Sequence, residues 1–195
     1  MGDVLDNKRD EDDILYAAFL AGDTEAFDRL ILKNSDTLTS FLKGFLYSWQ
    51  DAEDLMVEAF ARLLAGKPRI REGNFKAYLY KTARHLIARF YSKDRRRKVF
   101  SLDDEESGES IDPGFDAQLY ENLWQDEKKR VLRACLEKIP SEMREALWLV
   151  YFDEMSYEQA ASVMNVGRKK IDNLLSRGKK YLKEELEKEG ITSAD

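Results

Sequence analysis

The chain has 195 residues, enough for one domain or two small ones, and no apolar run nears the ~20 residues that a membrane-spanning helix needs. We therefore expect no membrane insertion. The N-terminus is acidic and lacks the apolar core of a signal peptide, and Cys135 is the only cysteine, so the sequence fits a cytoplasmic protein without an internal disulfide. His85 is the only histidine and no glycine-rich phosphate-binding loop is present, which argues against a metal centre, a cofactor and an enzyme.

The net charge of −6 is an average over oppositely charged segments. Residues 84–98 hold seven basic residues and one acid, and so do residues 168–183, whereas residues 103–121 hold eight acids and no lysine or arginine. Two basic blocks separated by an acidic one are typical of two nucleic-acid contacts joined by a tether.

Helical periodicity dominates the first half of the chain and strand-like alternation is scarce, so we expect an all-α fold. Gly22-Asp23 should end the first helix, and Asp51 is the expected N-cap of a later one. The predicted helices cover residues 12–20, 24–32, 38–49, 51–65 and 75–91. In the last of these, the residues at helical spacing that should face a core are Phe75, Leu79, Thr82, Leu86 and Phe90.

Residues 101–116 break the periodicity with acids, serines, glycines and a proline, and predict a flexible acidic linker, which we place at 99–118. The sequence thus predicts two small helical domains, residues 10–98 and 119–188. In the second, helices are expected at 119–139, where Pro140 ends the helix, and then at 141–152, 156–164 and 169–187. A capping box of Ser156 and Gln159 should begin the third of these helices.

The last two predicted helices have the proportions of a helix-turn-helix, with a short helix, a tight turn containing Gly167 and a longer helix. The longer helix should bury one stripe, formed by Ile171, Leu174, Leu175, Gly178 and Leu182. Its outward residues suit phosphates and base edges of duplex DNA; they are Arg168, Lys169, Lys170, Asp172, Asn173, Ser176, Arg177 and Lys180. A solvated surface helix would carry similar charges, but the capped helix and glycine turn before it favour DNA binding.

The first basic block differs because aromatic and polar residues lie among its cations, a pattern suited to the unstacked bases of separated DNA strands. The candidate contacts are Asn74, Tyr78, Lys81, Arg84, His85, Arg89, Arg95, Arg96 and Arg97, with Tyr80 and Tyr91 as further exposed-looking aromatics. For any single aromatic, such as Tyr78 or Tyr80, a place in the core is the better expectation. The adjacent cations at 95–98 favour phosphate contact.

A third feature is acidic and lies on the predicted helix at 51–65. It comprises Asp51, Glu53, Asp54 and Glu58, of which Asp54 and Glu58 share a face because they are four residues apart. Acids repel DNA, so we interpret this face as a protein-docking surface. The alternative is a solvated face whose first-turn acids favour the helix dipole.

These segments, in this order, resemble the extracytoplasmic-function (ECF, group 4) σ factors. Residues 51–60 resemble region 2.2, residues 75–85 resemble the aromatic-rich stretch of regions 2.3 and 2.4, and residues 136–186 resemble region 4. Gly22-Asp23 followed by Ala26-Phe27 is similar to the opening of region 2. The resemblance covers about residues 14–98 and 123–186.

The resemblance implies partners and roles. The chain would bind core RNA polymerase at the β′ clamp helices and the β flap, with the clamp contacts made by Asp51, Glu53, Asp54, Glu58 and Phe60. The helix at 75–98 and its preceding loop would open and read the −10 element of promoter DNA, and the helix at 169–181 would read the −35 element as duplex. The acidic linker would follow a path built for RNA. An anti-σ factor is expected as a further partner and could hold the protein at the membrane.

The chain departs from the family pattern at positions expected to touch bases. His85 replaces the usual Asn, Tyr78 the usual Trp and Arg89 a frequent Asp, while Asp172 stands where the family has a Lys. The bases preferred at either element therefore do not carry over from the family.

Two other functions fit parts of the same pattern. An ordinary helix-turn-helix regulator would bind duplex DNA without polymerase, and a σ-like adaptor would bind polymerase or an antagonist without recognising a promoter.

Overall fold

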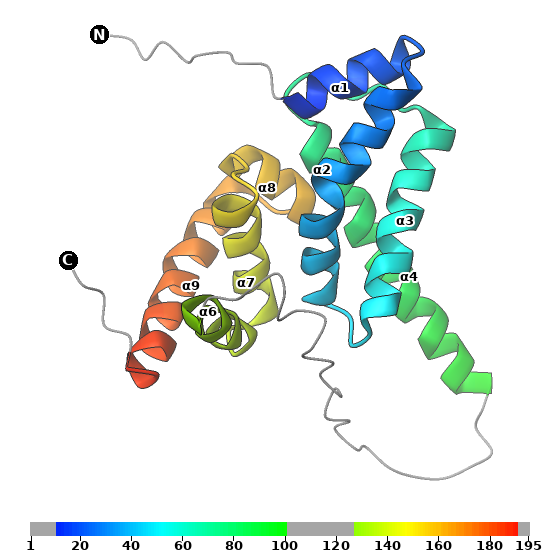
Figure 1. Cartoon of the computed structure of the whole chain (residues 1–195). Coiled ribbons are helices and arrows are strands. Elements are labelled where there is room, and N and C mark those ends of the chain that lie inside the picture. The colour runs from blue at the N-terminus through cyan, green and yellow to red at the C-terminus, as the bar shows by residue number, and fades with distance from the viewer. Residues whose placement is uncertain (1–10, 101–126, 191–195) are drawn as a thin grey trace, which may run out of the picture. The chain divides into compact units, whose positions relative to one another are not determined.

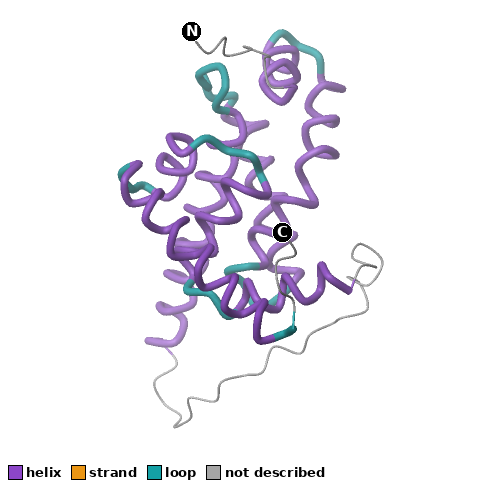
Figure 2. The backbone as a smooth tube through the Cα atoms, turned by 90° about the vertical axis from the view of Figure 1, so that its left-hand side faces the viewer, coloured by secondary structure: helices purple, strands orange, loops and turns teal. Residues whose placement is uncertain are grey.

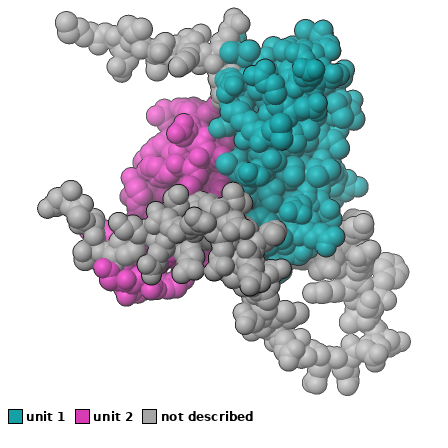
Figure 3. Space-filling view, viewed as in Figure 1, with its two compact units in different colours: residues 1–89 teal, residues 90–195 magenta. Residues whose placement is uncertain are grey.

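A computed structural model describes residues 11–100 and 127–190 of the chain (Figures 1 and 2). All regular structure in these two ranges is helical, which confirms the expected all-α class. No helix among them is both long and apolar enough to cross a membrane. The chain divides into two compact units, residues 1–89 and 90–195, which Figure 3 colours separately. The expected linker lies almost wholly outside the described ranges, so the predicted domain limits stay predictions.

Unit 1 contains α1 (Glu11–Leu20), α2 (Thr24–Lys43), α3 (Trp49–Gly66) and most of α4 (Phe75–Phe100). The turn from α1 to α2 uses Gly22 at φ 110°, a conformation open to glycine, as expected for the break there. The Asp23 carboxylate then accepts a hydrogen bond from the Ala26 backbone N–H at 3.2 Å and caps α2.

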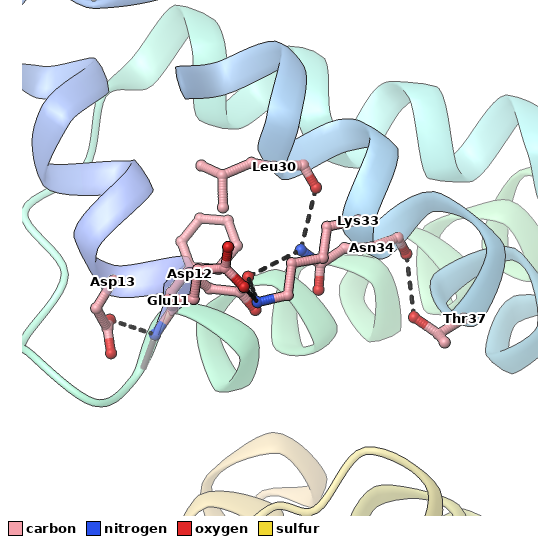
Figure 4. A network of polar contacts seen from close by, with 8 residues as sticks. Glu11, Asp12, Asp13, Leu30, Lys33, Asn34 and Thr37 are labelled. Carbon is pink, nitrogen blue, oxygen red and sulfur yellow. Dashed lines mark hydrogen bonds and ion pairs between the residues drawn. The ribbon is translucent and has the colours of Figure 1, made fainter. Parts of the chain in front are cut away.

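The break expected between residues 32 and 38 is absent, because α2 is one continuous helix. Asn34 is buried, and its amide donates to the Leu30 carbonyl at 3.0 Å and to the Asp12 carboxylate at 3.4 Å (Figure 4). The Thr37 hydroxyl donates to the Asn34 carbonyl at 3.2 Å. The polar side chains of Asn34 and Thr37 are therefore satisfied inside the helix and by α1.

The expected start of α3 is also wrong. The helix begins at Trp49, a residue that the sequence had placed at the end of the previous helix, and its N-cap is Ser48. The Ser48 hydroxyl accepts the Asp51 backbone N–H at 3.3 Å, so Asp51 lies in the first turn instead of capping the helix.

Aromatic side chains join the four helices of unit 1. Ring pairs form between Phe27 and Phe60, between Phe41 and Tyr80, and between Tyr16 and Phe75. In α4, Phe75, Leu79 and Leu86 are buried as expected, whereas Thr82 and Phe90 are only half-buried. Tyr80 is fully buried, which confirms the expected place in the core over the alternative of an exposed aromatic.

Unit 2 contains α6 (Glu127–Glu137), α7 (Ser141–Leu147), α8 (Tyr157–Met164) and α9 (Arg168–Lys188), with a π-helical turn, η1 (Trp148–Phe152), after α7. The predicted helix at 119–139 corresponds to α6, and its first residues lie outside the described ranges. The predicted helix at 141–152 corresponds to α7 and η1 together. The π-helical winding of η1 is shown by the Asp153 N–H, which donates to the carbonyl of Trp148, five residues earlier, at 3.1 Å.

The helix-turn-helix forms as predicted. The Ser156 hydroxyl accepts the Gln159 N–H at 3.2 Å and the Gln159 side chain accepts the Ser156 N–H at 2.7 Å, which confirms the capping box. Asn165 ends α8 in the left-handed conformation, and α9 begins two residues after Val166. The predicted inner stripe of α9 is buried at Ile171, Leu174, Leu175 and Gly178, while Leu182 is half-buried.

Candidate nucleic-acid and protein interfaces

The outward face of α9 contains all eight residues predicted to contact duplex DNA. Each is exposed: Arg168, Lys169, Lys170, Asp172, Asn173, Ser176, Arg177 and Lys180. The opposite side of α9 packs on α7 and α8, and the approach to α7 is close because a Cβ added at Gly178 would lie 3.1 Å from Leu147 Cδ1. This packing holds the polar face away from the core of unit 2.

Three cations of this face form ion pairs within the unit. The Arg168 guanidinium lies 2.8 Å from Glu158 of α8, Lys170 lies 3.1 Å from Glu142 of α7, and Lys180 lies 4.0 Å from Glu184. Both partners of each pair are largely exposed, and such pairs contribute little to stability. A phosphate could therefore replace the carboxylate at small cost.

The predicted contacts on α4 fall along one side of the helix. Asn74, Tyr78, Lys81, His85 and Arg89 are three or four residues apart, so they share a face, whereas Arg84 lies off this line. Tyr78 retains 39% of its surface, so the expectation of a core position is wrong for this residue, and His85 and Arg89 are exposed. Asn74, Lys81 and Arg84 are half-buried. The α4 face thus combines an accessible ring with cations, and α9 also has an exposed ring, Tyr181, four residues after Arg177.

The remaining predicted contacts of this set are Arg95, Arg96 and Arg97. They lie within α4, which is helical to Phe100, but their side chains are outside the described part of the structure. Tyr91 retains 37% of its surface and is exposed.

The acidic residues of α3 lie on its outer side. Glu53 and Asp54 are exposed, and Asp51 and Glu58 are half-buried. Glu58 lies 2.6 Å from Arg62 and 3.9 Å from Arg89 of α4, so it is shared between two cations. Phe60, in contrast, is buried and contacts Phe27 edge-on. Its predicted surface contact is therefore wrong, because its ring is part of the core behind α3.

The structure adds an apolar strip to this face that the sequence interpretation missed. Val57 and Leu64 retain 59% and 49% of their surface, and the exposed Ala61 lies between them at helical spacing. By helical spacing, Glu53 and Asp54 flank the strip. The sequence contains a signal for this strip, because apolar residues fall on two sides of α3. Only the side with Leu55 and Leu63 is buried. A second apolar side suggests a protein partner.

Comparisons with known proteins agree with this arrangement. The protein-family model of Sigma-70 region 2 matches residues 30–97, and the protein-family model of Sigma-70, region 4 matches residues 129–182. Together the two matches cover more than half of the chain. The chain is 28% identical over 163 residues to the RNA polymerase sigma-H factor of Pseudomonas aeruginosa, covering 80% of this chain and 83% of that protein. It is also 28% identical over 132 residues to the ECF RNA polymerase sigma factor SigM of Bacillus subtilis, covering 68% and 77%.

Two solved structures share the fold. CnrH, in complex with the cytosolic domain of CnrY, aligns with a TM-score of 0.61 and 21% identity over 91% of this chain and 98% of that one. The σ factor RpoE, in complex with the anti-σ factor NepR from Bartonella quintana, aligns with a TM-score of 0.61 and 24% identity over 84% and 98%. With both σ regions matched in order and relatives of this kind, the chain belongs to the σ70 family of RNA polymerase sigma factors, as a member of its extracytoplasmic-function group.

Proposed function

We propose that the chain binds core RNA polymerase and directs it to promoters, reading one DNA element as duplex with α9 and a second as a separated strand with α4. The observation that carries this proposal is the contrast between the two basic faces. The α9 face is the exposed side of the second helix of a helix-turn-helix, whereas the α4 face lies on a helix of unit 1 and places Tyr78 and His85 in one line with its cations.

The α9 face supports duplex reading at the −35 element. A helix of this kind fits the major groove, where Asn and Arg side chains can bond base edges and lysines can contact phosphates. Asn173 and Arg177 are four residues apart and are our candidates for base contacts. Asp172 beside them would accept a hydrogen bond from a cytosine amine instead of facing a phosphate.

The α4 face supports strand capture at the −10 element. Bases that have left the duplex can stack on an exposed ring, and here Tyr78 and His85 lie on one side of the helix. Lys81 and Arg89 on the same side would neutralise the strand's phosphates. The loop that precedes α4 adds Arg69 and Arg71, which are exposed.

The α3 face supports docking on the polymerase. Val57 and Leu64 supply apolar area at the centre, and Glu53 and Asp54 supply a charged rim, the usual anatomy of a specific protein interface. We place the β′ clamp helices here, and the β flap on unit 2. An acidic rim would also keep DNA away from this surface.

An anti-σ factor is the other partner that we propose. The solved structure of RpoE from Bartonella quintana contains the anti-σ factor NepR, and that of CnrH contains the cytosolic domain of CnrY. A cytoplasmic location follows from the proposed polymerase partner, and an anti-σ factor could hold the protein at the membrane.

Run-off transcription with core polymerase on a promoter library tests the proposal. We expect transcripts only when both chain and core are present, and alignment of the transcribed promoters should give two elements. A gel shift with and without core separates the alternatives. Tight binding of promoter duplex by the chain alone, with no association with core, would show an ordinary helix-turn-helix regulator and overturn the proposal.

A further inference from the structure

The loop at residues 67–74, which joins α3 to α4, is held at its first end by aromatic side chains of α1. The Tyr16 hydroxyl donates to the Pro68 carbonyl at 2.7 Å. One turn further along α1, the Phe19 ring lies under the Lys67 ammonium, 5.0 Å from its centroid, in a cation–π contact. The start of the loop is therefore fixed to the side of α1.

The other end of the loop is held by a single carboxylate. One oxygen of Asp13 accepts the Gly73 backbone N–H at 2.7 Å, and the other accepts the Phe75 N–H at 3.3 Å. Phe75 is the first residue of α4, so Asp13 also satisfies a backbone donor at that helix end, where a negative charge is favourable. Figure 4 shows Asp13 turned toward a backbone nitrogen, with one of these bonds dashed.

The helix that holds the loop is itself fixed to α2 by the neighbouring acids. Asp12 is buried and lies 2.9 Å from the Lys33 ammonium, and Glu11 lies 2.8 Å from the same nitrogen (Figure 4). The Asn34 amide also donates to Asp12. α1 is thus a rigid support for the loop.

The loop that α1 holds is basic, with three exposed cations against one exposed acid, Glu72. Lys67, Arg69 and Arg71 are exposed, and Asn74, its last residue, begins the line of predicted −10 contacts on α4. Fixing both ends of a loop lowers the entropy lost when it binds a flexible ligand. A separated DNA strand is such a ligand.

We propose that Asp13 is a positioning residue for promoter opening, because it holds the basic loop and the first turn of α4 in the arrangement that captures the separated −10 strand. This inference rests on the proposed function. Asp13 itself does not touch DNA, and it acts through the backbone of Gly73 and Phe75.

The test is Asp13→Asn in the full chain, assembled with core polymerase. The variant keeps the shape of the side chain but can accept only one of the two N–H groups, since its amide nitrogen would face the other. We expect the amide protons of Gly73 and Phe75 to exchange faster in the free protein. With a promoter containing a premelted −10 segment, the affinity of the holoenzyme should fall about tenfold, the equivalent of one charge-assisted hydrogen bond.

Two other measurements separate positioning from a loss of folding. The affinity for core polymerase and the binding of the −35 duplex by the holoenzyme should stay at the wild-type value. Asp28→Asn, which removes an exposed carboxylate from α2, is the matched control and should change nothing. Asp13→Glu should restore part of the lost affinity, and Tyr16→Phe, which releases only the Pro68 end, should cause a smaller loss.

The inference would be overturned if Asp13→Asn bound the premelted promoter as tightly as the wild type while the Gly73 and Phe75 amides lost protection. It would also be overturned if affinity for core fell in parallel with affinity for DNA, which would indicate a purely structural role. Failure of the proposed function would look different, because the wild-type holoenzyme itself would then not bind the premelted promoter.

Discussion

Tyr16 contributes to unit 1 through both its ring and its hydroxyl. The ring is buried and packs against Phe75, 5.2 Å between centroids, while the hydroxyl bonds the Pro68 carbonyl. Burial raises the pKa of the Tyr16 phenol above its ordinary value of 10.0, and the nearby Tyr78 adds to the rise. The folded state therefore holds the phenol proton more tightly than the unfolded state does.

This raised pKa fixes the sign of a pH effect. The stabilisation is complete below about pH 10 and is lost as the pH rises through the folded pKa. We expect Tyr16→Phe to lower the free energy of unfolding by about 0.5–1.5 kcal/mol at neutral pH. The difference from the wild type should shrink above the ordinary tyrosine pKa. Urea unfolding across a pH series measures it, and a difference that stayed constant into the alkaline range would contradict this account.

At the scale of the element, α3 has two apolar sides with different tasks. One side packs Leu55, Phe60 and Leu63 into the core, and the other exposes Val57 and Leu64. Because exposed side chains contribute little to folding, substitutions on the two sides should separate stability from binding.

We expect the double variant Val57→Ser and Leu64→Ser to keep its unfolding free energy within about 1 kcal/mol of the wild type. Its affinity for core polymerase should fall at least about tenfold, as for central residues of an interface. The control is Leu32→Ser on α2, which removes an even more exposed apolar side chain. If both proteins lost affinity equally, the α3 strip would not be the docking surface.

Sequence reasoning succeeded for elements whose signals are local. The capping box at Ser156 and the turn before α9 depend on residues within one or two helical turns, and both form as predicted. It failed where a distant partner decides. The break expected after residue 32 is absent, because α1 supplies Asp12, which accepts a hydrogen bond from Asn34 inside α2.

The candidate site shows the same division. The eight outward residues of α9 follow from helical spacing alone, and all eight are exposed. Phe60 was assigned to the surface by a motif, although its ring lies against Phe27, and Val57 and Leu64 were overlooked. The support that Asp13 gives to the loop before α4 spans 60 residues of sequence, and no local pattern predicts such a bond.

At the scale of the whole molecule, electrostatics should govern how tightly the holoenzyme binds its promoter. Each lysine that neutralises a phosphate releases a counterion and adds about one to the slope of log affinity against log salt. We expect the pair Lys169→Ala and Lys180→Ala, both on the α9 face, to reduce that slope by about two. Lys138→Ala is the control, since Lys138 lies outside α9 and pairs with Glu185 and Glu189 at the C-terminal end of that helix. A slope unchanged by the pair would remove α9 from the DNA contact.

The charge pattern of the whole chain also explains why these contacts should depend on polymerase. A protein of net charge −6 has two local basic faces, and its acidic and apolar α3 face is suited to a protein. Binding to core would bring both DNA-reading helices to one promoter and make the second contact effectively intramolecular.

Footprinting on a promoter taken from the transcription library tests most directly whether the chain opens promoters together with core polymerase. Permanganate reactivity of thymines detects the strand separation. With core polymerase present, we expect protection of two separate elements and reactive thymines at the downstream one. Removing core should abolish both signals, and Tyr78→Ala should reduce strand separation while leaving upstream protection intact. Equal protection of duplex DNA by the chain alone, with no strand separation when core is added, would show that the chain does not open promoters as a polymerase subunit.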